Sequence, residues 1–155
     1  MPNKNILLLG GAGYIGSVVT DHLLKLDYLV TNLDELIYDN FFAIKEYISN
    51  KNYSFLKENI DSYKINDNFL NNFDSVIILS GLVGDPITKK YDQLAKKYNE
   101  SCLENFISKC QKSKIKKLIF ISTCSNYGFI KEDEVADENH YLTPLSSYAK
   151  AKIKI

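Results

Sequence analysis

A tyrosine and a lysine four residues apart, Tyr148 and Lys152, form a pair that could move a proton. Residues spaced i and i+4 lie on one face of a helix, so the two side chains would be neighbours. A tyrosine hydroxyl has a pKa of about 10, and a nearby ammonium group lowers it toward neutral pH, where a phenolate can act as a base. The same spacing is frequent by chance, and its ordinary interpretation is an exposed helical pair. The elements around the pair therefore decide its meaning.

Residues 5–16 read Asn-Ile-Leu-Leu-Leu-Gly-Gly-Ala-Gly-Tyr-Ile-Gly, a short apolar strand that leads through glycines into a helix. Gly10 would permit the tight turn, Gly13 would let a pyrophosphate approach the backbone, and Gly16 would let the helix pack closely on the strand. The N–H groups of the first helical turn would then face the phosphates. Turns use glycine for many reasons, so this string alone is weak evidence.

An acidic residue follows the glycines at an informative distance. A second apolar run, residues 28–33, ends in Asp34, where a dinucleotide-binding fold places the acid that holds a ribose. No lysine follows the glycines, so the motif of triphosphate-binding loops is not matched. We therefore interpret the region as a dinucleotide site.

The composition narrows the class of protein. The 155 residues suffice for one domain with a core, and 19 basic residues balance 19 acidic ones, which gives no indication of nucleic acid or an anionic membrane as partner. The first strand leaves no room for a signal peptide, and no apolar run is long enough to span a membrane. Cys102, Cys110 and Cys124 have no metal-binding spacing, and His22 and His140 are isolated. We expect reduced thiols, no metal site and a cytoplasmic protein.

Strand and helix patterns alternate along the chain and predict an α/β fold with a doubly wound parallel sheet, about five strands in the order 3-2-1-4-5. Strands are expected at residues 6–9, 28–33, 53–56, 75–79 and 117–122. A helix is expected directly after the glycines, and its apolar face would be formed by Val18, Val19, Leu23, Leu24 and Leu26. Further helices are expected at residues 38–48, at residues 92–111 and from Ser146 or Ser147 onward. Leu94 is expected on the apolar face of the helix at residues 92–111. The acidic residues 131–139 are expected to form a loop. Ligands of such sheets bind at the carboxyl ends of the strands, where residues 80–86 and 122–128 also belong.

Together these motifs resemble the amino-terminal half of the NAD-dependent epimerase/dehydratase family, extended short-chain dehydrogenases/reductases that act on sugar nucleotides. The resemblance covers nearly the whole chain and implies NAD as cofactor, a nucleoside-diphosphate sugar as substrate and a homodimer at full length. Asp34 matches the acid that holds the adenosine ribose, which favours NAD over NADP. The positions implied in cofactor binding are Gly10, Gly13, Tyr14, Ile15, Gly16, Asp34, Asn59, Ile60, Leu79, Ser80, Gly81, Tyr148 and Lys152.

The resemblance implies catalytic positions as well, namely Thr123, Tyr148, Lys152 and Asn99. Tyr148 as a phenolate would take a proton from a sugar hydroxyl while hydride passes to the nicotinamide. Lys152 would hold the nicotinamide ribose and lower the tyrosine pKa, and Thr123 would hydrogen-bond the reacting oxygen. Asn99 matches an asparagine of the family's long helix.

Two substitutions and the length of the chain refine this expectation. Sugar 4,6-dehydratases of the family carry Asp-Glu after the catalytic threonine, whereas Cys124 and Ser125 stand here, which favours an epimerase or a reductase. Asn59 stands where the family usually has an aspartate that reads adenine. We expect residues 1–155 to form one NAD(P)-binding Rossmann domain without the carboxyl-terminal substrate-binding part. The alternative is a free-standing NAD-binding module without activity.

Overall fold

The structure is a computed structural model, and it describes residues 4–62, 64–84 and 90–155. Two compact units are found within it. The first unit contains the described residues up to Ser80 together with Asn105–Ile121, and it holds the whole sheet. The second unit contains the described residues of Gly81–Glu104 together with Ser122–Ile155.

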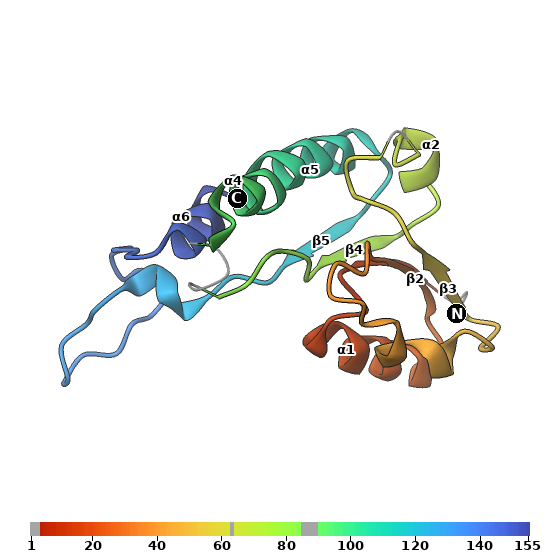
Figure 1. Cartoon of the computed structure of the whole chain (residues 1–155), viewed down its shortest axis with the longest axis horizontal. Helices are drawn as coiled ribbons and strands as arrows, with labels where there is room; N and C mark the ends of the chain where they lie inside the picture. Colours follow the sequence, from red (N-terminus) through yellow and green to blue (C-terminus); the bar gives the residue numbers. More distant parts are fainter. Residues whose placement is uncertain (1–3, 63, 85–89) are drawn as a thin grey trace. The chain divides into compact units, whose positions relative to one another are not determined.

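Five parallel strands form the sheet of the first unit, in the order β3-β2-β1-β4-β5 (Figure 1). This confirms the predicted fold class and strand order. Each predicted strand is present, and its ends lie within two residues of the predicted ones. The strands are β1 (Asn5–Leu9), β2 (Leu29–Leu33), β3 (Tyr53–Leu56), β4 (Ser75–Ile78) and β5 (Lys117–Phe120).

Both faces of the sheet carry buried apolar side chains, as expected for a parallel sheet covered by helices. Leu8 of β1 belongs to a cluster with Val30 of β2 and Leu24 of helix α1 (Tyr14–Lys25). Its neighbour Leu7 points to the opposite face, because side chains alternate along a strand, and is also fully buried. Figure 1 shows α1 on one side of the sheet and helix α5 (Cys102–Lys112) on the other.

The buried stripe of α1 is narrower than the sequence predicts. Gly16, Thr20 and Leu24 are its buried residues, each four positions from the next. Val18 and Leu26, predicted on the apolar face, are more than half exposed. Gly16, which has no side chain, lies in the first turn of α1, where the helix packs against the sheet. This turn therefore approaches the sheet more closely than it could with a valine at position 16.

The prediction of a helix at residues 38–48 is wrong. Two separate 3-10 turns stand in its place, η1 (Phe41–Ala43) and η2 (Lys45–Tyr47). Ile44 interrupts them with φ of −124° and is fully buried in the cluster around Leu8. Aromatic and β-branched residues are weak helix formers, so burial of Ile44 decides the local path.

The helix predicted at residues 92–111 is present but not uniform. It consists of α4 (Asp92–Lys96), a π-helical turn η3 (Lys97–Ser101) and α5. Ala95, Asn99, Cys102 and Phe106 form one buried stripe at helical spacing, whereas Leu94, predicted on the apolar face, lies beside this stripe and is 41% exposed. Single π turns of this kind frequently occur at functional sites.

The second unit also contains the 3-10 turn η4 (Cys124–Tyr127) and helix α6 (Ser147–Lys154). α6 begins where the sequence predicts, because the Ser146 hydroxyl accepts a hydrogen bond from the Ala149 N–H at 3.1 Å. Residues 131–139 form no helix or strand, as expected. Part of the predicted loop at residues 80–86, namely residues 85 and 86, lies outside the described residues.

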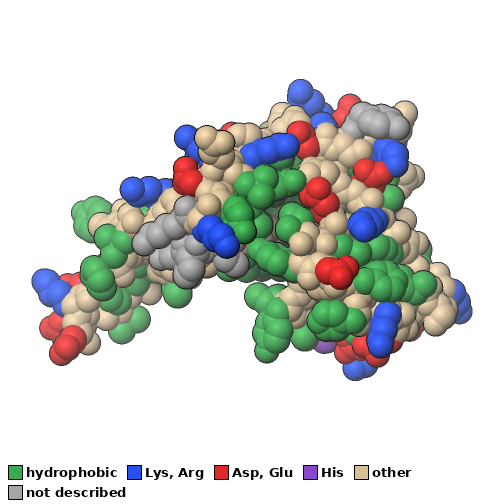
Figure 2. Space-filling view, in the orientation of Figure 1, with side chains coloured by type: hydrophobic (Ala, Val, Ile, Leu, Met, Phe, Trp, Pro, Cys, Tyr) green, Lys and Arg blue, Asp and Glu red, His purple; other side chains and the backbone are tan. Residues whose placement is uncertain are grey.

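One short helix of the first unit, α2 (Asp67–Leu70), was not predicted. Its signal was present in the sequence, because Asn66 caps it by accepting a hydrogen bond from the Phe69 N–H at 3.1 Å. None of the helices in the described ranges is long and apolar enough to cross a membrane. Acidic and basic side chains are mixed over the face shown in Figure 2.

Candidate functional site

The glycine turn between β1 and α1 is held tightly against the sheet. Gly10 has φ of +79°, a left-handed conformation that glycine adopts without strain, and its N–H donates to the Leu33 carbonyl at 2.9 Å. A Cβ on Gly10 would lie 2.7 Å from the Ser80 nitrogen, and a Cβ on Gly16 would collide with the Gly10 carbonyl oxygen. Side chains at these two positions would therefore force the turn apart.

Asp34 lies directly beside this turn. Its carboxylate accepts hydrogen bonds from the Ala12 N–H at 3.0 Å and from the Leu36 N–H at 2.8 Å. Leu36 adopts a φ of +56°, which is uncommon for a bulky residue and stores strain at the end of β2. The carboxylate is thus fixed in direction and, having several lone pairs, can accept further hydrogen bonds from a ligand.

The amino end of α1 is open toward the same side. Gly13 is its cap residue and provides no side-chain hydrogen bond, and the first turn contains no acidic residue. Tyr14 and Ile15 follow with largely exposed side chains. The first N–H groups of a helix have no partner within the helix, and together with the helix dipole they attract an anion. The arrangement can therefore bind a phosphate group.

The loops after β3 and β4 add further polar groups to the first unit. Asn59 donates from its side-chain amide to Glu35 at 2.9 Å and accepts from the Asp61 N–H at 2.8 Å, while Ile60 is buried. The Ser80 hydroxyl oxygen, next to Gly10, is buried and has no hydrogen-bond partner among the described residues. A buried polar atom without a partner is costly, so a ligand that approached it could supply the missing hydrogen bond.

The second unit holds the tyrosine and the lysine on α6. The Lys152 ammonium nitrogen lies 5.7 Å from the centre of the Tyr148 ring, so the spacing does bring the two side chains together. Burial raises the pKa of Tyr148 and lowers the pKa of Lys152. The lowering of the tyrosine pKa that the sequence suggested is therefore not found, because desolvation disfavours both charged forms and dominates both shifts.

Thr123 caps the η4 turn of the second unit. Its hydroxyl oxygen accepts from the Ser125 N–H at 3.2 Å, which leaves the hydroxyl proton for another acceptor. The side-chain amide of Asn126, in the same turn, donates to the Ser122 hydroxyl at 3.0 Å, and the backbone carbonyl of Asn126 accepts from the Thr143 N–H at 3.0 Å. These contacts tie the threonine turn to the segment that leads into α6.

Asn99 occupies the π-helical turn η3 and faces inward, only 6% exposed. Its side-chain oxygen accepts from the Leu82 N–H and its side-chain nitrogen donates to the Leu82 carbonyl, each at 2.8 Å. A Cβ on Gly81 would lie 2.9 Å from the same oxygen. Asn99 therefore holds the backbone of the segment that follows β4 through two hydrogen bonds, which use both polar atoms of its side chain.

Within the first unit, the structure thus brings together the glycine turn, Asp34 and Ser80; within the second, it brings together Tyr148 with Lys152 and, separately, Asn99 with Gly81. Sequence reasoning missed Asn32, a fully buried residue whose side chain contacts the glycine turn. Its signal was an asparagine inside a mainly apolar strand, two positions before the acid.

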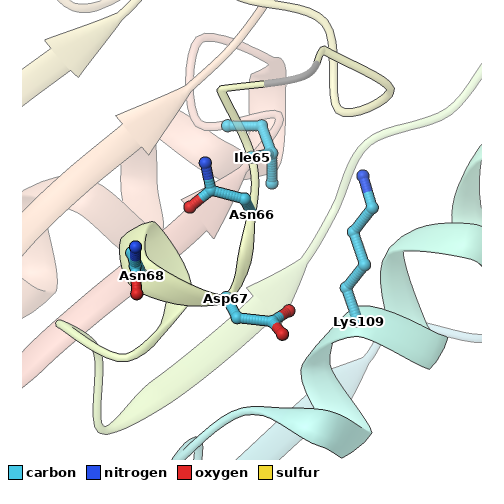
Figure 3. Close-up of a pocket in the computed structure, with 5 residues that line it drawn as sticks. All are labelled: Ile65, Asn66, Asp67, Asn68 and Lys109. Carbon is cyan, nitrogen blue, oxygen red and sulfur yellow. The ribbon is translucent and has the colours of Figure 1, made fainter.

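A pocket of about 510 Å³ lies elsewhere in the first unit. Figure 3 shows Asp67 of α2 and Lys109 of α5 on opposite sides of it, with Ile65, Asn66 and Asn68 completing the lining. α2 and the end of α5 lead into the first residues of β4 and β5, so the pocket is at the amino ends of the strands. Ligands of parallel sheets bind at the opposite edge, where the glycine turn lies.

Cysteines and histidines form no cluster with acidic residues that could hold a metal, among the residues that the structure describes. Cys102 and Cys110 are buried and Cys124 is exposed, all as free thiols.

Comparison with known proteins gives the same picture as the motifs. Residues 6–155 match the model of the NAD dependent epimerase/dehydratase family. An uncharacterized UDP-glucose epimerase of Bacillus subtilis is 29% identical over 96% of this chain and 48% of its own length. A probable UDP-arabinose 4-epimerase of Arabidopsis thaliana is 31% identical over 96% of the chain and 37% of its own length.

A solved structure agrees. The UDP-glucuronic acid 4-epimerase of Bacillus cereus, in complex with UDP-glucuronic acid and NAD, superposes with a TM-score of 0.87 at 28% identity, covering 97% of this chain and 49% of that one. The chain thus spans about half, or less, of the length of these relatives. It belongs to the NAD dependent epimerase/dehydratase family.

Proposed function

We propose that this member of the family is the cofactor-binding and proton-transferring part of an NAD-dependent epimerase that acts on a nucleoside-diphosphate sugar. The observation that carries the proposal is the uncapped amino end of α1 beside the fixed carboxylate of Asp34. One provides N–H groups for a pyrophosphate and the other provides acceptors for ribose hydroxyls. The relatives named as UDP-sugar epimerases supply the class of substrate.

The residues of the first unit fit NAD. The N–H groups of Tyr14 and Ile15 would bind the pyrophosphate, and Asp34 would bind the adenosine ribose. A phosphate on that ribose would meet the carboxylate of Asp34, so NAD is favoured over NADP. The buried hydroxyl of Ser80 would gain a hydrogen-bond partner from the bound cofactor. Asn59 and Ile60 would contact the adenine from the loop after β3.

NAD, when bound, would supply the hydride-transfer chemistry. The chain's own residues would handle the proton: Tyr148 would remove it from the sugar hydroxyl, and Thr123 would donate a hydrogen bond to the reacting oxygen without giving up its own proton. Because burial raises the pKa of Tyr148, this role requires the ammonium group of Lys152 to approach the phenol oxygen. Lys152 lies one helical turn away and has a side chain long enough to do so.

Asn99 would act as a positioning residue. Through Leu82 it fixes the backbone next to Gly81 and Ser80, which would line the cofactor together with Leu79. Elimination of water by a 4,6-dehydratase calls for carboxylic acids directly after the threonine. Cys124 and Ser125 occupy these positions, which disfavours elimination and fits an epimerase or a reductase. The relatives named as UDP-sugar epimerases favour epimerisation.

Calorimetric titration of NAD into the 155-residue chain tests this proposal. We expect the wild type to bind NAD and Asp34→Arg to weaken binding about 10- to 100-fold, the range for losing hydrogen bonds to a charged group. Asp39→Arg makes the same charge change in the same loop and should alter the affinity less than threefold. A folded wild type that does not bind NAD, or an Asp34→Arg variant that binds as well as wild type, would contradict the proposal.

A further inference from the structure

Asn32 is a polar residue in the core of the first unit. It lies in β2, is 0% exposed, and shares its face of the strand with Val30 of the apolar cluster and with Asp34. Asparagine is seldom buried so completely, and a buried amide is tolerated only when its polar atoms are paired. Both of its side-chain polar atoms have partners.

The partners of Asn32 belong to the glycine turn and to β3. Its side-chain oxygen accepts from the Gly11 N–H at 2.9 Å, and its side-chain nitrogen donates to the Tyr53 hydroxyl oxygen at 3.0 Å. The amide can face only this way, because a backbone N–H has no lone pair to accept with. A Cβ on Gly11 would collide with the side chain of Asn32, so the contact also requires glycine at position 11.

Asn32 and Asp34 therefore hold consecutive N–H groups of the turn, those of Gly11 and Ala12. Neither N–H group is then available to a ligand. The Gly13 N–H donates to the Gly10 carbonyl at 3.1 Å. The N–H groups of Tyr14 and Ile15 follow it along the chain, and their direction depends on where the turn is held. Two side chains on one face of β2 thus fix the turn from which an anion would be bound.

We propose that Asn32, held in place by the Tyr53 hydroxyl, is a positioning residue that sets the orientation of the phosphate-binding turn. This inference rests on the proposed function of that turn. Burial raises the pKa of Tyr53 to about 12, so its hydroxyl is neutral over the physiological range, and its oxygen accepts the hydrogen bond from Asn32. An apolar residue at position 32 would leave the Gly11 N–H buried without a partner.

The chain provides a matched control for the tyrosine. Tyr47 packs against Tyr53 in the same cluster, with ring centres 5.8 Å apart. Both lose only a hydroxyl on substitution by phenylalanine. The Tyr53 hydroxyl contacts Asn32, whereas that of Tyr47 interacts with Glu46. Tyr53→Phe and Tyr47→Phe therefore separate the effect on the turn from a general effect on the core.

The test compares two ligands that share the adenosine part, of which only ADP-ribose also carries the pyrophosphate and the ribose attached to it. Binding of ADP-ribose and of adenosine is measured by amide NMR titration, which covers millimolar affinities, in wild type, Tyr53→Phe, Tyr47→Phe and Asn32→Leu. We expect ADP-ribose to bind three- to tenfold more weakly to Tyr53→Phe and more than tenfold more weakly to Asn32→Leu. Adenosine affinity should change less than twofold in every variant, and Tyr47→Phe should change neither affinity. Hydrogen exchange of the Gly11 amide should accelerate in Tyr53→Phe, which keeps the test valid if Asn32→Leu does not fold.

Unchanged ADP-ribose affinity in Tyr53→Phe, or equal losses for ADP-ribose and adenosine, would overturn the positioning role and assign Asn32 to stability alone. A folded wild type that binds neither ligand would overturn the proposed function, and this inference with it. A wild type that binds both, with variants that lose neither, overturns the inference and leaves the proposed function standing.

Discussion

The two units of the chain hold their candidate functional groups in different ways. In the first, backbone N–H groups and a carboxylate are fixed by short hydrogen bonds around a turn in which side chains at Gly10 and Gly16 would collide with the backbone. In the second, Tyr148 and Lys152 stand on an eight-residue helix. A hydroxyl cap begins this helix, and exposed ion pairs from Lys154 to Glu100 and Glu104 support its end.

This difference suggests a division of labour. An anion-binding turn must be preformed, because backbone groups cannot be reoriented without moving the whole chain. Side chains that transfer protons can instead adjust by rotation, and a short helix depends on its tertiary contacts for stability. The first unit should therefore tolerate few changes at its turn, whereas the second should lose chemistry when a single side chain changes and lose little else.

The largest expected effect is that of Tyr148→Phe on turnover of a nucleoside-diphosphate sugar, measured here and in the other turnover experiments on a version of the protein that includes a substrate-binding part. Removal of the hydroxyl deletes the proposed base and should reduce the rate by about 10²- to 10⁴-fold, while NAD affinity stays within about twofold. The rate is measured by NMR of the sugar, and the affinity by calorimetry. Tyr141→Phe, on a tyrosine that is 86% exposed in the same unit, is the control and should keep full activity. Turnover by Tyr148→Phe above half the wild-type rate would remove Tyr148 from the mechanism.

Two glycine substitutions sharpen the comparison from the side of the first unit. Gly16→Ala places a Cβ against the Gly10 carbonyl and should lower the free energy of unfolding by about 1–3 kcal/mol or more, with at least tenfold weaker NAD binding. Gly13→Ala, whose Cβ would lie 3.2 Å from the same oxygen, should cost less than about 1 kcal/mol. Urea denaturation measures both. Equal losses in the two variants would show that the turn is not held as closely as described.

A smaller effect is expected from Lys154→Met, which removes the ion pairs to Glu100 at 2.9 Å and to Glu104 at 3.0 Å. Exposed ion pairs contribute little and are screened by salt. Because α6 loses one of its supports, turnover at low salt should fall, by no more than about threefold. In 1 M NaCl, where salt screens the ion pairs, the turnover of the variant should equal that of wild type. Lys150→Met on the same helix is the control. A loss that persists in high salt would contradict an electrostatic role.

The smallest effect concerns stability against acid in the first unit. Hydrogen bonds from the Asn5 N–H at 3.1 Å and from Lys116 at 3.0 Å hold the pKa of Asp74 below its usual range. As pH falls, the aspartate of the unfolded chain, with a pKa of about 3.9, is protonated at a higher pH than Asp74 of the folded chain. The stabilisation of the fold by ionised Asp74 is therefore present above about pH 4, and it is lost as pH falls through the lower pKa of the folded chain. Asp74→Asn should make the urea midpoint fall less steeply between pH 5 and pH 3. An unchanged slope would exclude the contribution.

The sequence predicts the strands and the glycine turn better than the helical segments, because the evidence for strands and for the glycine turn is local. Apolar runs such as Leu7–Leu9 and the spacing of Gly10 and Gly16 lead directly to the sheet order and to the turn. The π-helical turn around Asn99 leaves no such pattern, since it depends on the contact with Leu82. The helix predicted at residues 38–48 is absent for a similar reason, because its local path depends on the burial of Ile44 by tertiary packing.

The candidate site shows the same limit. Asp34 could be predicted as a site residue from its distance to the glycines. The hydrogen bond between the Gly11 N–H and the Asn32 side chain could not be predicted in this way, because it depends on the register that aligns β2 with β1 and β3. The direction of the Tyr148 pKa shift could not be inferred from spacing either. The lysine neighbour was visible in the sequence, whereas the burial that dominates the shift was not.

Amide NMR of the ¹⁵N-labelled chain, recorded with and without NAD, tests the central claim most directly. The account predicts that NAD shifts the amide signals of Tyr14, Ile15 and Leu36, around the open end of α1 and Asp34, and leaves those of Asp67 and Lys109 unchanged. Shifts confined to Asp67, Lys109 and their neighbours would instead place the ligand in the pocket at the amino ends of the strands. That result would contradict the assignment of the glycine turn as the cofactor site.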